Sequence, residues 1–197
     1  MNAFVFPGQG SQHLGMGADL YNSNQKAQQI FEDANEILGF KITDIMFGED
    51  QEALKQTNIT QPAIYIHSMV IALIANKSFK PNAVAGHSLG EFTALAAANY
   101  ISFEDGLRLV QKRAIAMQEA CEKNESSMAA IVGLDDNIVE GVCSQSKETL
   151  VAANYNCPGQ IVISGTINAV NIACNKLTEL GARRALVLPV RGAFHSP

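Results

Sequence analysis

The stretch VAGHSLGEF, residues 84–92, holds the residues that decide the fold. A short apolar run precedes it and an alanine-rich segment follows, which predicts a strand, a tight turn at Ser88 and a helix. Side chains flanking the serine would collide in such a turn, which explains Gly86 and Gly90. The pattern indicates an α/β fold with a nucleophilic serine at the carboxyl edge of a sheet. The alternative is a glycine-flanked serine in an ordinary turn.

The composition bounds the class of protein. The chain has 197 residues, 47% of them hydrophobic, which fits one domain or one domain with a small insertion. A net charge of -5 argues against a nucleic-acid surface. No apolar run approaches the ~20 residues that span a membrane, and the N-terminus is unlike a secretory signal, so we expect a cytoplasmic protein. The four cysteines lack metal-ligand spacing, which predicts free thiols and no metal site.

Two segments of the chain differ in their predicted order of strands and helices. Apolar runs at 3–6 and 83–86 predict buried strands with helices between and after them. From residue 126 onward the elements follow the order β-α-β-β-α-β, the split βαβ or ferredoxin-like pattern. We therefore expect a small subdomain at 126–190, inserted in a catalytic subdomain made of 1–125 and 191–197.

Two backbone N–H groups are candidates for stabilising an oxyanion. The N–H of Leu89 follows the serine at the start of the predicted helix. The N–H of Gln9 lies in the glycine-rich loop VFPGQGSQ, where Gly8 and Gly10 allow close backbone approach. This loop does not fit a phosphate loop, because it lacks the GxxxxGK[ST] and GxGxxG patterns.

Arg113 lies at the edge of a buried helical stripe, three residues after Val110 and four before Met117. An inward guanidinium needs an anionic partner, because an unpaired buried charge is costly. Two partners are open: an internal salt bridge, for example with Glu91, or the carboxylate of a substrate.

The general base is expected among four histidines. His87 adjoins Ser88, and neighbours in a strand point to opposite faces, so His87 is expected to line the pocket instead. His67 lies inside an apolar helix and His13 in the glycine loop, where structural or surface roles fit. By elimination His195 is the best base, since it follows the last predicted strand and comes after the serine, as in α/β hydrolases.

Six motifs occur in an order that resembles the malonyl-CoA:acyl carrier protein transacylase family. They are FVFPGQGSQ, TQPA, GHSLGE, VQKRAIAMQ, NYNCPGQIVISG and LPVRGAFHSP. The sequence is also similar to the acyltransferase domains of polyketide and fatty acid synthases. The resemblance covers essentially the whole chain. It implies an α/β-hydrolase-like large subdomain with a parallel sheet, incomplete at its C-terminus, plus an inserted ferredoxin-like small subdomain.

The resemblance also implies the roles of individual residues. Ser88 matches the family's nucleophile and His195 its general base. Gln9 and Leu89 match the backbone oxyanion donors, and Arg113 matches the arginine that holds the malonyl carboxylate.

Further residues are implied to lie near the substrate. Gln61, in TQPA, matches a residue near the active site. His87, next to Ser88, is expected to line the pocket. Asn154 and Gln160 belong to the small subdomain facing the cleft. The motifs GHSLG and GAFHS resemble the malonyl-selecting variants of the family.

The activity implied by the resemblance is malonyl transfer in fatty acid biosynthesis. Malonyl-CoA donates the group, the phosphopantetheine thiol of acyl carrier protein accepts it, and malonyl-Ser88 is the ping-pong intermediate. The enzyme is expected to be a monomer without a bound cofactor. Two alternatives stay open: a serine hydrolase or thioesterase, and an inactive fragment that only binds carrier protein.

The resemblance also implies a longer chain. Family members continue past the FHS motif with a glutamine that orients the histidine, whereas this chain stops at Pro197. We therefore expect a fragment, or a chain that another chain completes. Arg191, before GAFHS, stands where relatives often carry a small residue.

Overall fold

The computed structural model describes residues 1–123, 125–190 and 192–197. Within these ranges the chain forms two compact units, Met1–Ala116 and Met117–Pro197. Each unit is described by itself, and Arg191 lies outside the described residues. The subdomain limits expected from the sequence stay predictions.

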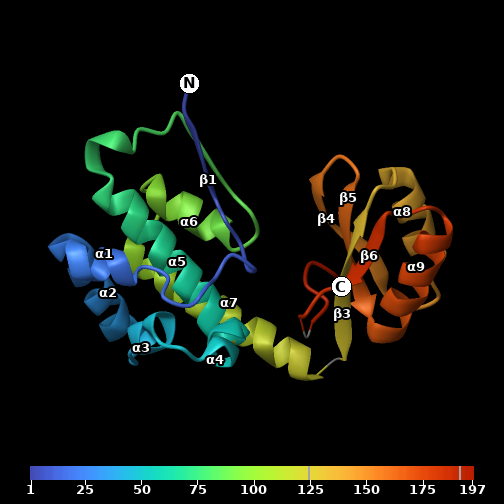
Figure 1. Ribbon diagram of the computed structural model, residues 1–197, viewed down its shortest axis with the longest axis horizontal. Coiled ribbons are helices and arrows are strands. Elements are labelled where there is room, and N and C mark those ends of the chain that lie inside the picture. Colours follow the sequence, from blue (N-terminus) through green and yellow to red (C-terminus); the bar gives the residue numbers. More distant parts are fainter. Residues whose placement is uncertain (124, 191) are drawn as a thin grey trace. The chain divides into compact units, whose positions relative to one another are not determined.

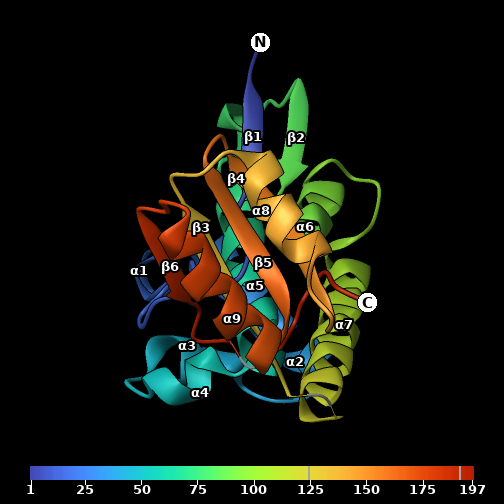
Figure 2. The ribbon, with the colours of Figure 1, turned by 90° about the vertical axis from the view of Figure 1, so that its right-hand side faces the viewer.

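The first unit holds a small parallel sheet and several helices. Its elements are β1 (Ala3–Phe6), α1 (Ala18–Ser23), α2 (Gln25–Leu38), α3 (Ile42–Phe47), α4 (Gln51–Lys55), α5 (Thr57–Ile74), η1 (Asn76–Ser78), β2 (Ala83–Gly86), α6 (Gly90–Ala97) and α7 (Phe103–Lys123), which continues past the unit's end. Strands β1 and β2 run side by side and parallel, with Phe6 opposite Gly86 (Figure 2). The carboxyl ends of both strands therefore meet at one edge of the sheet.

Local sequence signals set the helix limits. The Asn24 side chain accepts a hydrogen bond from the Ala27 N–H at 3.0 Å, which caps α2. Gly39 ends α2 in the left-handed region, at φ 77°. Ser102 caps α7 by accepting from the Asp105 N–H at 2.9 Å. Ser102 and Asp105 stand three residues apart, the spacing of a capping box, which is a signal that can be read from the sequence.

Helix α5 forms the centre of the first core. It packs between α2 and α6 (Figure 1) and is buried on nearly every side. Tyr65 is fully buried, and its hydroxyl donates to the Phe103 carbonyl at the start of α7, at 3.0 Å. Phe31 of α2 and Leu107 of α7 are also fully buried in this core. Burial of these side chains is the main source of stability for α2, α5 and α7.

The second unit is an antiparallel sheet covered by helices on one face (Figures 1 and 2). Its elements are β3 (Ser126–Val132), α8 (Asp136–Ser144), β4 (Leu150–Cys157), β5 (Gln160–Thr166), α9 (Ile167–Glu179) and β6 (Arg184–Val187). The strand order is β4-β5-β3-β6, and all three pairings are antiparallel. This is the ferredoxin-like arrangement expected from the sequence. None of the helices in the described ranges is long and apolar enough to span a bilayer.

Candidate active site

Ser88 lies in a strained turn between β2 and α6. Its φ is 53°, in the left-handed region that side-chain-bearing residues seldom adopt. A β-carbon on Gly86 would lie 1.9 Å from the carbonyl carbon of Gly90, and one on Gly90 would lie 2.2 Å from the Phe6 carbonyl oxygen. Only glycine fits at both flanking positions. The geometry is that of a nucleophile elbow, with β1 packed against the start of α6.

The loop after β1 lies beside this turn. The His87 N–H donates to the Phe6 carbonyl at 3.0 Å, and a β-carbon on Gly8 would lie 2.6 Å from the His87 carbonyl oxygen. Leu89 is buried and precedes the first residue of α6. In the described part of the chain, the N–H groups of Gln9 and Leu89 donate no hydrogen bond. Their use as oxyanion donors stays a prediction.

Arg113 of α7 binds the serine directly. Its Nη2 donates to Ser88 Oγ at 2.8 Å, and its Nη1 donates to Gln61 Oε1 at 2.5 Å. The guanidinium also lies over the Phe92 ring, with Cζ 5.9 Å from the ring centroid. Burial lowers the pKa of Arg113 and the charge of Glu91 raises it, yet arginine keeps its proton at neutral pH.

The structure favours one of the two partners expected for Arg113. Among the described residues, no carboxylate lies within 4.0 Å of the guanidinium, so the salt bridge with Glu91 is absent. Gln61 instead holds the guanidinium from α5, where its side chain is fully buried. The neutral amide adds no negative charge, and Glu91 acts on the guanidinium only from beyond contact distance. The site therefore presents a half-buried cation at the hydroxyl of the serine.

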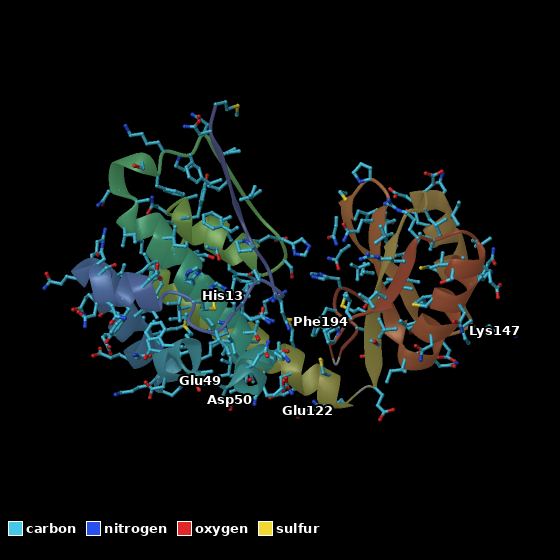
Figure 3. The ribbon with its side chains drawn as sticks, viewed as in Figure 1. His13, Glu49, Asp50, Glu122, Lys147 and Phe194 are labelled. Atoms are coloured by element: carbon cyan, nitrogen blue, oxygen red, sulfur yellow. The ribbon has the colours of Figure 1, made fainter. Side chains whose placement is uncertain are left out.

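The remaining expected residues lie in the second unit. His195 has φ 57°, in a short C-terminal loop. This loop is tied to the sheet, because Ala193 N–H donates to Ser126 Oγ at 2.9 Å and Ser164 Oγ donates to the Phe194 carbonyl at 2.8 Å (Phe194 is labelled in Figure 3). The place of His195 beside Ser88 stays a prediction.

Asn154 and Gln160 lie on neighbouring strands of the same sheet. Asn154 is in β4, where the register shifts after Ala152, and Gln160 begins β5. Gln160 Oε1 accepts from the Cys157 thiol at 3.5 Å. Contact of either residue with substrate stays a prediction.

The sequence matches the family described as acyl transferase domain over residues 3–197. The chain belongs to the acyl transferase domain family. A relative from Staphylococcus aureus (strain MRSA252), named malonyl CoA-acyl carrier protein transacylase, is 43% identical over 197 residues, which are 98% of this chain and 64% of the relative. A relative of the same name from Bacillus subtilis (strain 168) is 43% identical over 198 residues, which cover 98% of this chain and 62% of the relative. The resemblance noted in the sequence is confirmed.

Solved structures agree with this assignment. An acyl-carrier-protein S-malonyltransferase from Burkholderia pseudomallei 1710b has a TM-score of 0.92 at 41% identity, covering 98% of this chain and 64% of that one. PlMCAT, a malonyl-transacylase solved with its type II polyketide synthase acyl carrier protein AntF, has a TM-score of 0.92 at 38% identity, covering 97% of this chain and 63% of that one. The expected fold class is confirmed. The chain spans less than two thirds of the length of these relatives.

Phe92 is a site residue that the sequence reasoning missed. It lies in the first turn of α6, whereas Ser88 precedes this helix in the left-handed region, so no helical spacing links the two residues. An apolar residue in a helix usually indicates core packing, and the sequence carried no signal that set Phe92 apart. Its contact with the Arg113 guanidinium gives it a second role.

His13 and His67 form a pair of titratable side chains in the first unit. His13 lies beside α5, where His67 is located (His13 is labelled in Figure 3). The centroids of the two imidazole rings are 6.3 Å apart, and the rings are edge-on to one another. Burial lowers the pKa of His67, and the charge of His13 lowers it further. Within the described ranges, no group of three His, Cys, Asp or Glu side chains could hold a metal ion.

Proposed function

We propose that this acyl transferase moves a malonyl group from malonyl-CoA to the phosphopantetheine thiol of acyl carrier protein. The observation that supports it is the 2.8 Å hydrogen bond from Arg113 Nη2 to Ser88 Oγ. A cation at the nucleophile suits an acyl group whose carboxylate is one methylene away from its carbonyl. The same arginine can then hold the carboxylate while Ser88 reaches the carbonyl carbon.

The first half-reaction forms malonyl-Ser88. His195 accepts the hydroxyl proton as Ser88 Oγ attacks the thioester carbonyl carbon. The N–H groups of Gln9 and Leu89 stabilise the negative charge that develops on the carbonyl oxygen. The carbon–sulfur bond then breaks, and His195 gives its proton to the leaving coenzyme A sulfur.

The second half-reaction reverses these steps with a new thiol. His195 accepts the proton of the phosphopantetheine thiol, and the sulfur attacks the carbonyl carbon of the malonyl ester. The bond between this carbon and Ser88 Oγ then breaks, and His195 returns the proton to Ser88 Oγ. The solved complex of PlMCAT with its acyl carrier protein supports a carrier protein as the acceptor. The names of the curated relatives support malonyl-CoA as the donor.

Selectivity follows from the charge of Arg113, which no carboxylate of the described residues contacts. A malonyl carboxylate pairs with the guanidinium, whereas an acetyl group leaves a half-buried cation without an anion. The penalty falls on every acyl group that lacks a carboxylate, so the site selects by charge.

Intact-protein mass spectrometry of the 197-residue chain with malonyl-CoA tests the proposal. We expect one malonyl adduct, located on Ser88, absent from Ser88→Ala and discharged by holo-acyl carrier protein. Discharge by water at the same rate without carrier protein would indicate a hydrolase. A chain that binds carrier protein but forms no adduct would be a binding fragment and would contradict the proposal.

A further inference from the structure

Ser88 and a substrate carboxylate need the same donor, Nη2 of Arg113. We propose that the serine hydroxyl occupies this donor in the empty site and that the carboxylate of the acyl group displaces it. Acid recognition and release of the nucleophile then occur in one exchange. This inference rests on the proposed function, and extends it by giving the nucleophile a part in substrate selection.

The guanidinium is anchored on one side and exchangeable on the other. Nη1 donates to Oε1 of Gln61, a fully buried side chain on α5, at 2.5 Å. The ring of Phe92 lies against the guanidinium, with Cζ 5.9 Å from its centroid. These contacts hold the plane of Arg113 in place. Nη2 can therefore change its acceptor from Ser88 Oγ to a carboxylate oxygen without moving the arginine.

The contact restrains the serine as well. A hydrogen bond from a cation draws on a lone pair of Oγ, and a lone pair must form the new bond to the acyl carbon. The backbone of Ser88 is fixed in the left-handed region at φ 53°, so the hydroxyl can leave Arg113 only by rotating about χ1. In the empty site the nucleophile is therefore less reactive than a serine hydroxyl that accepts no hydrogen bond from a cation.

A carboxylate oxygen is expected to bind Nη2 of Arg113 more strongly than Ser88 Oγ does. A carboxylate adds a full negative charge to the hydrogen bond from the guanidinium, whereas the serine hydroxyl accepts the same bond as a neutral group. An acetyl group offers no such acceptor and leaves Ser88 bound to Arg113. Neutral acyl groups are thus disfavoured by the unpaired cation and again by the restrained nucleophile.

Binding of free malonate measures the exchange without any need for catalysis. Isothermal titration calorimetry would compare the full chain with Ser88→Ala, where no hydroxyl competes for Nη2. We expect the Kd of malonate to fall about fivefold, the factor given by one net hydrogen bond. Ser88→Gly is a second variant with the same expected result, since glycine accepts the positive φ of this turn. Arg113→Ala should lose malonate binding.

Matched controls separate the exchange from general changes in the site. Malonamide has the same size without charge, and its binding should not tighten in either Ser88 variant. Ser23→Ala removes an exposed serine of α1, whose hydroxyl donates to the Asp19 carbonyl, and should leave the Kd of malonate unchanged. Unchanged or weaker malonate binding by both Ser88 variants would overturn the inference, as would no binding by the unmodified chain. The proposed function is judged separately by the adduct on Ser88.

Discussion

Gly86 and Gly90 approach so closely that a β-carbon on the first would lie 1.9 Å from the carbonyl carbon of the second. The atoms in the way are backbone atoms, so no side chain can move aside. We expect Gly86→Ala to lower the free energy of unfolding by about 3 kcal/mol or more, through overpacking at a turn that cannot relax. Urea denaturation followed by circular dichroism measures it.

Gly141→Ala is the matched control for this substitution. Gly141 lies inside α8, and a β-carbon there would meet no atom within 4 Å. Alanine in a helix interior is favoured over glycine by about 1 kcal/mol, so this variant should be equally or more stable than the parent. Equal losses in both variants would contradict the steric account of the turn.

Arg113→Ala should remove the preference of the site for malonyl over acetyl groups. The guanidinium that donates to Ser88 Oγ and Gln61 Oε1 is lost, and with it the partner for a substrate carboxylate. Truncation of one partner of a buried ion pair costs about 2–5 kcal/mol, so kcat/KM for malonyl transfer should fall by about 10²- to 10³-fold. Acetyl transfer should change less than about tenfold, because that group makes no ion pair.

The two acyl donors must be measured on the same preparations with the same carrier protein. Arg113→Lys keeps the charge but loses the planar, two-armed donor, and should restore part of the malonyl rate. Losses of equal size for malonyl and acetyl transfer would contradict a carboxylate-binding role for Arg113.

Thr93 carries a buried hydroxyl whose removal should stabilise the fold. Its side chain is fully buried on α6, and within the described residues its Oγ1 has no hydrogen-bond partner. Thr93→Val replaces the hydroxyl by a methyl group of similar size and should raise the free energy of unfolding by about 1 kcal/mol. Thr93→Ser keeps the hydroxyl and loses a methyl group, so it should lower stability by about 1 kcal/mol. Thermal unfolding of both variants should show opposite shifts; a loss in Thr93→Val would mean that the hydroxyl is satisfied.

Local signals explain which parts of the fold were predictable. The glycines around Ser88 and the cap at Ser102 act over a few residues, so sequence spacing indicated both correctly. Pro62 is a weaker signal, since it suggests a helix start near residue 60, whereas α5 begins at Thr57 and holds the proline in its second turn.

Long-range partners were not predictable in the same way. Arg113 and Gln61 are 52 residues apart on different helices. The pattern of apolar residues around Arg113 indicated only that its side chain faces inward. An acidic partner was the natural expectation for a buried arginine, but packing of α5 against the site supplies an amide instead. The pairing depends on how the helices pack, which no local pattern encodes.

Thiol reactivity should separate the cysteines by burial. Cys157 is exposed, whereas burial raises the pKa of the Cys143 thiol to about 11 and raises that of Cys174 as well. The thiolate is the reactive form, so at a pH near 8 only about one Cys143 in 10³ would be ionised. Labelling of the folded chain with Ellman's reagent should show a fast phase that Cys157→Ser removes. A fast phase that survives in Cys157→Ser would contradict this order.

The stability of the folded chain should fall as the pH drops, with His67 as one cause. Burial lowers the pKa of His67 below 6.5, and the charge of His13 lowers it further, while Asp19 opposes both. Between the folded and unfolded pKa values the unfolded chain binds the extra proton, so the free energy of unfolding decreases with decreasing pH. The decrease should begin near the unfolded pKa of about 6.5 and end once the folded state is also protonated.

His67→Gln tests this assignment because glutamine is polar but does not titrate. Urea midpoints measured at several values between about pH 5 and pH 8 should show a shallower dependence in this variant than in the parent. His13→Gln is the matched control on the exposed side of the pair. It removes one of the two effects that lower the pKa of His67, so most of the dependence should remain while its lower limit moves to higher pH. An unchanged dependence in His67→Gln would assign the loss of stability to other groups.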